Sequence, residues 1–493
     1  MTHFKKQKIV AREKETTLLQ ALLEEKKAQF IALYGRRRIG KTYLIEQFFQ
    51  NKGVYFSLTG MYQADMVSQL ENFQQKFSQQ FPSSPLPLSK TLKSWRDAFE
   101  CITAQIIQTP KNQYFILFFD ELPWLAGRKS RFLHYLDYFW NTNWKNYTHL
   151  KLIVCGSAAS WMLDKIIHSK GGLHNRITRK ILLRPFSLRQ TKEFLLYRNC
   201  RLTNSQVLDY YMIFGGVPYY LEFIQKNLSI DQNIQNILFD SDAPLQSEFP
   251  QIFKSLFNDS LGHIKIIEIL SNKRSGLLRS EISTLCQIPS GGNLKKKLLE
   301  LQAAGFINYY SPMGHHRKNK FYMLTDEFSL FYLKWVKEIL DLGLDRPLNY
   351  WINTRNTPSW NSWAGYSFES ICFKHSNQII SALNLDTIKV LPSTWRYKHK
   401  MKSNKISGAQ IDLLLERSDN AITICEIKYS KNPYIMDKKS AISILNKIEV
   451  FKEVTQTKSQ IFTVLITVEG VARSAWTKEV FDQVITLDQL FTK

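Results

Sequence analysis

The sequence lacks the residue patterns that hold structural metals or disulfide frameworks. Its six cysteines are scattered without any CxxC spacing, and its ten histidines include no HxxxH pair. Scattered cysteines without such spacing are typical of a reduced protein of the cytoplasm. We therefore expect a cytoplasmic protein with no zinc cage and no metal site built on histidine or cysteine.

Long apolar runs are also absent. No stretch approaches the roughly 18 uninterrupted apolar residues that a membrane-spanning helix needs. The basic N-terminal segment MTHFKKQKIVAREKETTLL has no apolar core of signal-peptide length. No repeat of fixed period is evident. These absences predict a soluble protein without a membrane partner.

Acidic residues are in deficit. The chain has 42 Asp and Glu against 66 Lys and Arg, which gives a formal net charge of +24. An excess of this size normally indicates a polyanionic partner, either nucleic acid or an anionic membrane surface. No basic amphipathic helix of the kind that lies on a membrane supports the second alternative. Nucleic acid is therefore the expected partner, with DNA preferred over RNA.

A glycine-rich loop lies between a predicted strand and a predicted helix in FIALYGRRRIGKTYLIEQFF, residues 30–49. The loop matches GxxxxGK[ST] and predicts a phosphate cradle. Backbone N–H groups and the helix N-terminus would surround the nucleotide phosphates, Lys41 would reach the β and γ oxygens, and Thr42 would hold Mg²⁺. The predicted nucleotide-binding residues of the loop are Gly35, Arg36, Arg37, Arg38, Ile39, Gly40, Lys41 and Thr42.

Two further apolar strands end in polar residues. QYFILFFDELPWL, residues 113–125, reaches Asp120 and Glu121, which we assign to the magnesium side and to the base that polarises the attacking water. LKLIVCGSAASWM, residues 150–162, reaches Ser157, which would sense the γ-phosphate or position water. A plain helix N-cap is the alternative for Ser157. Strands that alternate with helices predict a parallel, doubly wound sheet with its ligand at the carboxyl ends of the strands.

Residues 5–225 resemble the archaeal-type ATPases, a branch of the AAA+ and STAND-like P-loop proteins. AREKET corresponds to the family's GRExEL, with Ala11 in place of glycine and Arg12 on the adenine side of the nucleotide. In GGLHNRITRKILLRPFS, Arg176 matches an arginine that faces nucleotide or a neighbouring subunit; a solvated or nucleic-acid-facing basic edge is the alternative. FGGVPYYLE resembles the family's lid motif around Pro218. The resemblance implies ATP and Mg²⁺ as cofactors and ATP hydrolysis as the activity, and it leaves a homo-oligomer open.

Three helical patterns and a hairpin follow between residues 263 and 324. The helices are HIKIIEILSN, LLRSEISTLCQ and SGGNLKKKLLELQAAG, and the hairpin is FINYYSPMGHHRKNKFYML. This order predicts a winged helix-turn-helix. The cationic residues that suit phosphate contacts are Lys295, Lys296 and Lys297 on the third helix and Arg317, Lys318 and Lys320 in the hairpin loop. Packing against the ATPase lid or a partner is the alternative use of such a domain.

Charged residues interrupt apolar runs in QIDLLLERSDNAITICEIKYS, residues 410–430. The pattern predicts a hairpin in which Glu426 and Lys428 share one face of a strand and Asp412 on the partner strand meets them. Two carboxylates and one ammonium would form a divalent-metal site suited to phosphodiester hydrolysis, with Asp412 and Glu426 as metal ligands. A simple ion pair between Glu426 and Lys428 is the alternative. The preceding WRYKHKMKSNK, residues 395–405, would guide a phosphate backbone and stack a base on Trp395 or Tyr397, or would only solubilise the chain.

Residues 361–470 resemble the PD-(D/E)xK nuclease superfamily, and specifically the nuclease-like domain that follows archaeal-type ATPases. The resemblance adds Glu369, on the helix in WAGYSFESICFKH, to Asp412, Glu426 and Lys428 as catalytic residues. Gln410 stands where that family usually has an acidic residue. The domain is therefore expected either to cleave nucleic acid or to have kept the fold and lost catalysis.

These segments together predict an α/β protein of several domains, which its 493 residues and 44% hydrophobic content can support. The predicted order is a P-loop parallel-sheet ATPase domain over residues 1–188, a helical lid over 189–255, a winged helix-turn-helix over 256–345 and a C-terminal α/β restriction-endonuclease-like domain over 358–493. We expect ATP to govern nucleic-acid binding or cleavage by the last domain. The alternative is a STAND-like regulatory DNA-binding switch with an inactive nuclease-like domain.

Overall fold

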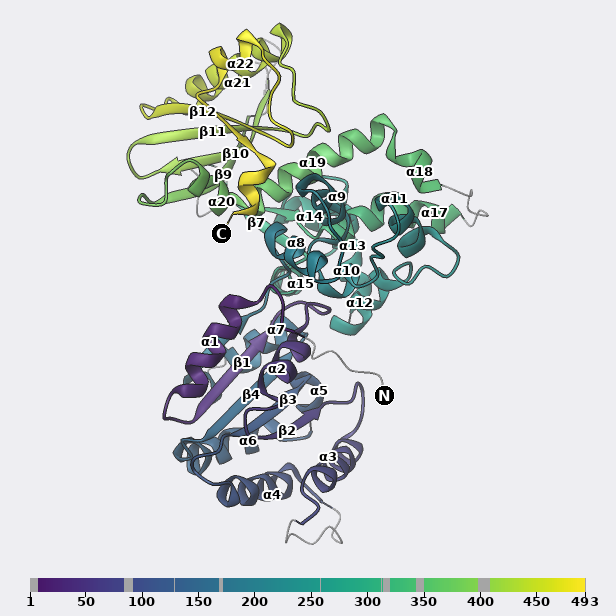
Figure 1. Ribbon diagram of the computed structural model, residues 1–493, viewed down its shortest axis with the longest axis vertical. Coiled ribbons are helices and arrows are strands. Elements are labelled where there is room, and N and C mark those ends of the chain that lie inside the picture. Colours follow the sequence, from purple (N-terminus) through teal and green to yellow (C-terminus); the bar gives the residue numbers. More distant parts are fainter. Residues whose placement is uncertain are drawn as a thin grey trace. The chain divides into compact units, whose positions relative to one another are not determined.

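The computed structural model describes residues 8–83, 92–127, 129–167, 172–257, 259–311, 313, 320–342, 350–397 and 408–492. The chain divides into two compact units (Figure 1), residues 1–185 with 303–305 and residues 186–302 with 306–493. Among the described residues, no helix combines the length and the hydropathy needed to cross a bilayer. Arg317 and Lys318 of the predicted hairpin loop, and residues 398–405 of the predicted basic segment, lie outside these ranges.

A five-stranded parallel sheet forms the centre of the first unit, in the order β2-β3-β4-β1-β5. Its strands are β1 (Gln29–Tyr34), β2 (Val54–Thr59), β3 (Phe115–Asp120), β4 (Leu150–Gly156) and β5 (Arg179–Leu182). Strands β3 and β4 are buried along their whole length, which explains why their sequences are nearly continuous apolar runs. The predicted parallel α/β sheet is confirmed.

Helices cover both faces of this sheet (Figure 1). Helices α1 (Glu13–Glu24) and α2 (Lys41–Phe49) pack on one face, and α3 (Met66–Gln80), α4 (Trp95–Gln108) and α6 (Phe132–Thr142) pack on the other. Side chains of one strand alternate between the two cores, so Phe30 faces one core and Ile31 the other. Because all strands run in the same direction, the residues that follow β1, β3 and β4 meet at one edge of the sheet.

The second unit begins with short helices and a small antiparallel sheet. The helices are α8 (Leu188–Tyr197), α9 (Asn204–Phe214), α10 (Pro218–Leu221), α11 (Ile230–Ile234), α12 (Glu248–Leu256), α13 (Ser260–Ser271), α14 (Arg279–Cys286) and α15 (Gly292–Ala303). Strands β6 (Leu277–Leu278), β7 (Ile307–Tyr310) and β8 (Phe321–Leu324) pair in the order β6-β8-β7. Lys297 does not lie on the exposed face of α15 as predicted. It is 5% exposed and its Nζ donates to Asp259 Oδ2 at 2.5 Å, so it stabilises the interior instead.

A helix occupies a segment that the sequence marked only as a boundary. Helix α18 (Tyr350–Arg355) buries Trp351 completely. The Arg355 guanidinium donates to Asp209 on α9 and, at 2.5 Å, to Asp231 Oδ1 on α11. Tyr429 Oη also donates to Asp209, at 3.4 Å. These buried polar contacts fix α18 against the helices that precede it.

A mixed five-stranded sheet forms the C-terminal part, in the order β13-β12-β11-β10-β9. Its strands are β9 (Val390–Tyr397), β10 (Ala409–Arg417), β11 (Ala421–Lys428), β12 (Gln460–Thr467) and β13 (Gln483–Thr486). Neighbours from β9 to β11 are antiparallel, and those from β11 to β13 are parallel. Helix α19 (Pro358–Lys374) contacts β10 and β11. Helix α21 (Lys438–Thr455) packs Ile444 and Ile448 into the core that contains Ile422 and Ile424 of β11.

Candidate functional site

The loop between β1 and α2 has a backbone that only glycine permits at its first position. Gly35 has φ +149, and a Cβ there would lie 2.3 Å from the Leu183 carbonyl oxygen. Gly40, the N-cap of α2, has φ +82. Glycine adopts such angles without steric penalty, so the loop curls tightly and directs the first N–H groups of α2 to its interior. This is the geometry of a phosphate cradle.

Lys41 and Thr42 take the positions that the motif predicts. Lys41 is 6% exposed, and its Nζ donates to the carbonyl oxygens of Gly35 at 3.0 Å and Arg36 at 2.8 Å. Thr42 Oγ1 donates to Asp120 Oδ2 at 2.6 Å. A hydroxyl and a carboxylate in contact are hard oxygen donors of the kind that Mg²⁺ prefers. The pair therefore fits a magnesium ion beside the cradle.

Glu121 and Ser157 contact each other at the carboxyl ends of β3 and β4. Glu121 Oε2 accepts hydrogen bonds from Ser157 Oγ at 2.8 Å and Ser157 N at 3.2 Å. Glu121 has φ +45, a left-handed conformation that is uncommon for a non-glycine residue and clusters at functional sites. The Ser157 hydroxyl thus holds the carboxylate of Glu121. Its predicted role in sensing phosphate or positioning water stays a prediction.

Arg12 supports the loop from outside. Its Nη1 donates to the Arg184 carbonyl at 2.8 Å and its Nη2 to the Ile39 carbonyl at 3.1 Å. Burial lowers the pKa of the Arg12 guanidinium to about 10, although Glu15 acts in the opposite direction. Arg12 therefore connects the phosphate loop to the segment after β5. Its predicted contact with adenine stays a prediction.

Arg176 and Pro218 are not brought to the cradle within the first unit. Arg176 is exposed and lies two residues before Thr178, whose N–H donates to the Phe30 carbonyl near the start of β1. The cradle follows the other end of β1, about 16 Å away at about 3.3 Å per residue. A role for Arg176 toward a neighbouring subunit stays a prediction. Pro218 lies in the second unit, at the first position of α10.

Three carboxylates and two ammonium groups gather around β10 and β11 of the second unit. Glu426 Oε1 lies 2.8 Å from Lys428 Nζ, and its Oε2 lies 2.6 Å from the Nζ of Lys447 on α21. Asp412 and Glu369 both interact electrostatically with Glu426. We call these five residues the carboxylate cluster. The structure thus brings together all four predicted C-terminal residues.

A register shift places Asp412. The pairing of β9 with β10 is interrupted between Ile411 and Leu414, while Leu413 stays opposite Cys425 on β11. Such an irregularity re-aims a side chain locally and is common near active sites. Gln410 Nε2 donates to Asp412 Oδ1 at 2.8 Å. The residue that replaces the usual acid of the resembled family therefore donates a hydrogen bond that favours the charged form of Asp412.

The carboxylates of the cluster differ in their affinity for protons. Burial, together with Asp412 and Glu426, raises the pKa of Glu369 to about 8. Burial and the charge of Glu426 likewise raise the pKa of Asp412. At Glu426 burial acts in the same direction, but Lys447 and Lys428 outweigh it and the pKa is lowered. A pKa of about 8 favours the protonated form of Glu369 at neutral pH, which reduces the negative charge around Glu426.

The cluster does not fit a metal ion as it is arranged. Both oxygens of Glu426 accept from lysines, and across the described ranges no group of three or more His, Cys, Asp or Glu side chains is placed to hold a metal. A cation would have to displace a lysine from Glu426. Sequence reasoning missed Lys447. The sequence does give one indication of this role. Lys447 lies three residues after the buried Ile444, at the border of the apolar face of α21.

Comparisons with known proteins find a match for the part of the chain that carries the phosphate loop. Residues 9–224 match the family described as an ATPase domain predominantly from Archaea. An uncharacterized protein of Methanocaldococcus jannaschii is 24% identical over 431 residues, which cover 85% of this chain and 87% of that protein. An uncharacterized ATP-binding protein of the same organism is 49% identical over 45 residues, 9% of this chain and 76% of that protein.

A solved structure shares the fold. The Walker-type ATPase of Pyrococcus abyssi is 20% identical to this chain, with a TM-score of 0.50, and the match covers 66% of this chain and 96% of that one. The phosphate loop, the Thr42–Asp120 pair and the parallel sheet agree with the match over residues 9–224. Over residues 9–224 the chain is therefore similar to the ATPase domains found predominantly in Archaea.

Proposed function

We propose that the protein hydrolyses ATP and uses its nucleotide state to govern nucleic-acid binding by its C-terminal domain, which we assign to the nuclease-like type. The observation that carries the ATP step is the contact of Thr42 with Asp120 at 2.6 Å beside the buried ammonium of Lys41. Lys41 and Thr42 begin α2, and Asp120 ends β3, so the contact joins residues that are distant in sequence. They converge where the loop would bind phosphate.

The chain's own residues divide the chemistry among them. The loop N–H groups and Lys41 bind the phosphates, while Thr42 and Asp120 would hold Mg²⁺, whose charge would neutralise that of the phosphates. Glu121 orients the attacking water and accepts its proton. Ser157 keeps the Glu121 carboxylate in place through the bond at 2.8 Å.

The Glu121→Gln variant is expected to bind ATP as the wild type does and to hydrolyse it about 10²-fold or more slowly. Glutamine keeps the shape of the side chain and an oxygen for Ser157, but it cannot accept the proton. Phosphate release and nucleotide affinity are measured on the same preparations. Glu100→Gln is the matched control, because Glu100 is an exposed residue of α4 that pairs with Arg96. Unchanged turnover in Glu121→Gln would exclude Glu121 as the base.

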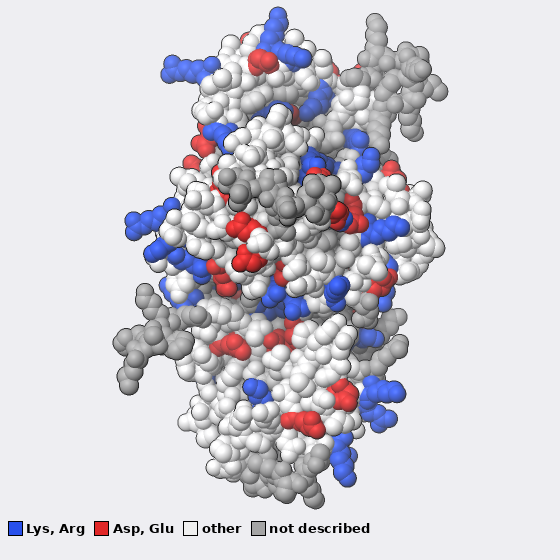
Figure 2. Space-filling view, turned by 90° about the vertical axis from the view of Figure 1, so that its right-hand side faces the viewer, with Lys and Arg blue, Asp and Glu red and all other residues white. Residues whose placement is uncertain are grey.

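Several features support nucleic acid as the partner. The net charge is +24, and three helices with a short antiparallel sheet occur in the order expected of a winged helix. Figure 2 shows Lys and Arg side chains spread over the visible face and interspersed with acidic ones. Binding without cleavage is favoured at the C-terminal domain because Lys428 and Lys447 already occupy both oxygens of Glu426.

Cleavage by the same domain is the second candidate. It is favoured by the convergence of Glu369, Asp412, Glu426 and Lys428, the residue types that metal-dependent phosphodiester hydrolysis requires. For this activity a divalent ion would have to replace a lysine at Glu426. The two candidates share nucleic-acid binding and differ only in turnover.

The Asp412→Ala variant separates the two candidates. DNA and RNA are incubated with wild type and variant in Mg²⁺, with and without ATP, and Asp419→Ala in the exposed turn between β10 and β11 serves as control. We expect salt-sensitive binding in all three proteins and cleavage in none. Cleavage by wild type and control that disappears in Asp412→Ala would instead establish the nuclease.

A further inference from the structure

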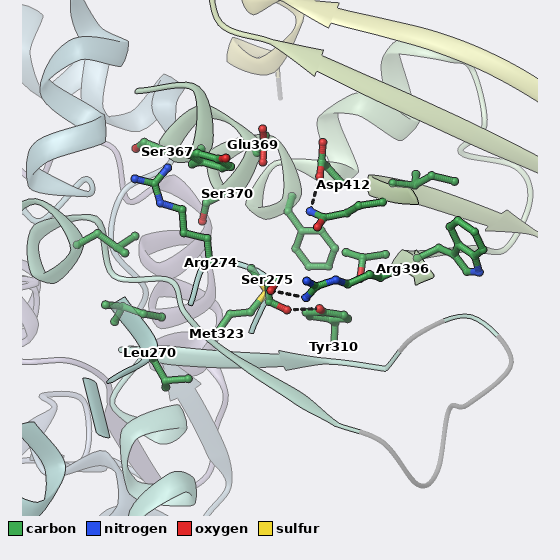
Figure 3. A pocket seen from close by; sticks show the side chains of 18 of the residues that line it. Leu270, Arg274, Ser275, Tyr310, Met323, Ser367, Glu369, Ser370, Arg396 and Asp412 are labelled. Atoms are coloured by element: carbon green, nitrogen blue, oxygen red, sulfur yellow. Dashed lines mark hydrogen bonds between the residues drawn. The ribbon is translucent and has the colours of Figure 1, made fainter. Parts of the chain in front are cut away.

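A pocket of the second unit lies beside the carboxylate cluster and carries groups that the ATPase reaction does not use. Its walls come from the turn after α13, from β7 and β8, from α19 and from β9 and β10. Figure 3 shows Arg274, Arg396, Glu369 and Asp412 around this pocket. Two cationic and two acidic side chains therefore surround the same small space.

Arg274 presents its guanidinium at the turn between α13 and β6. The guanidinium carbon lies 3.8 Å from the centroid of the Tyr366 ring, and Nη1 donates to the Ser362 carbonyl at 3.4 Å. Arginine has five N–H donors in a planar fork, so most of them find no acceptor within the described part of the chain. The stack on Tyr366 holds the plane in place while its donors stay available to a ligand.

Ser275 holds the second arginine at the same turn. Its Oγ accepts a hydrogen bond from Arg396 Nη1 at 2.5 Å, and its carbonyl accepts one from Tyr310 Oη at 2.6 Å. Gly276, with φ +73, follows and reverses the chain into β6. Arg396 is thus fixed to the residue that follows Arg274, and both arginines line the pocket.

A buried hydroxyl also lines the pocket. Ser367 on α19 is 4% exposed, and its Oγ has no hydrogen-bond partner in the residues that the structure describes. A buried polar group without a partner is destabilising, and it is rare in native proteins. A ligand that reaches this wall of the pocket would supply the missing bond.

We propose that this pocket binds one unpaired nucleotide of a nucleic-acid strand. Arg274 and Arg396 hold its phosphate, because guanidinium forks match phosphate oxygens. The base lies against the face of the Arg274 guanidinium that is turned away from Tyr366, and Ser367 and Gln410 bond its polar edge. Paired bases stay stacked inside a duplex and do not enter a pocket, so the ligand is single-stranded. The proposal rests on the proposed nucleic-acid binding and adds where one nucleotide sits.

The test is a binding measurement on the full chain in the presence of EDTA, which removes cleavage from the readout. Anisotropy of a short fluorescent oligothymidylate gives Kd over a range of salt concentrations. Arg274→Ala is expected to weaken binding about tenfold or more, and to reduce the slope of log Kd against log salt by about 0.7, the value of one single-strand phosphate contact. Arg274→Lys is expected to restore the slope but not the full affinity, since lysine lacks the planar stack.

Arg417→Ala is the matched control, because Arg417 pairs with Asp419 at the other end of β10. Unlabelled single strand, hairpin duplex and free thymidine monophosphate each compete with the probe for the protein. The comparison shows whether the bound nucleotide belongs to a single strand, to a duplex or to a free nucleotide. Unchanged Kd and slope in Arg274→Ala, or equal competition by duplex, would overturn the pocket and leave the proposed function standing. If the wild type does not bind the strand at all, the proposed function is wrong. In that case, binding of thymidine monophosphate that depends on Arg274 would still support a nucleotide site in this pocket, and no such binding would overturn the pocket as well.

Discussion

Lys41→Ala is expected to abolish measurable ATP binding and hydrolysis. The ammonium is 6% exposed and lies at the centre of the phosphate loop, within 3.0 Å of two loop carbonyls. Alanine removes the cation that would meet the β and γ oxygens and leaves those carbonyls facing the phosphates. Both changes disfavour a polyanion in a water-poor site, where electrostatic interactions are strong.

Thermal or urea unfolding with and without Mg·ATP measures this effect apart from the stability of the variant itself. Ligand at a hundred times its Kd stabilises a protein by about 2.7 kcal/mol, so the wild type is expected to gain this amount and Lys41→Ala to gain nothing. Lys26→Ala, at an exposed position after α1, is expected to respond as the wild type does. A nucleotide-dependent gain in Lys41→Ala would contradict the assignment of the loop.

Arg355→Ala is expected to lower the free energy of unfolding of the second unit by about 3–5 kcal/mol, the usual effect of removing one partner of a buried ion pair. Arg355 is 8% exposed and donates to both Asp209 and Asp231. Without it, the buried Asp209 keeps the Tyr429 hydroxyl and the charge of Lys431 but loses its ion pair with Arg355. Urea titration at neutral pH gives the size of the loss.

The pH dependence identifies the cause of that loss. Burial already raises the pKa of Asp209 in the presence of Arg355, and removal of the cation raises it further. A carboxyl whose pKa is higher in the folded than in the unfolded state stabilises the fold less as the pH increases. The deficit of Arg355→Ala is therefore expected to be larger at pH 8 than at pH 5, and Asp209→Asn in the same chain is expected to remove this dependence. A deficit that does not change with pH would contradict the argument.

The nucleotide site was predictable because its signal is local. Gly35, Gly40 and Lys41 lie in one short loop, and their spacing reports the backbone geometry directly. Asp120 and Glu121 follow a strand whose burial on both faces leaves a continuous apolar run. Parallel strand order then brings these ends together without further information.

The carboxylate cluster was predictable only in part because its balance depends on tertiary packing. Strand alternation places Glu426 and Lys428 on one face, but nothing local indicates that Lys447 reaches Glu426 from a separate helix. The register shift near Asp412 is equally invisible, since it depends on the pairing of β10 with β9. Lys297 was misplaced for a related reason. Its partner Asp259 lies 38 positions away, and a charged residue on a helix is otherwise expected in solvent.

Strand β11 ends at Lys428, and this residue and the next one, Tyr429, contact different neighbours. Lys428 bonds Glu426 in the carboxylate cluster, and Tyr429 bonds Asp209 on α9. One peptide bond joins the two, and the peptide group is planar and resists twisting. A displacement of α9 that pulls on the Tyr429 hydroxyl therefore acts on the backbone one residue away from Lys428. A helix whose Asp209 lies 220 positions before Tyr429 thus contacts the chain directly beside the carboxylate cluster.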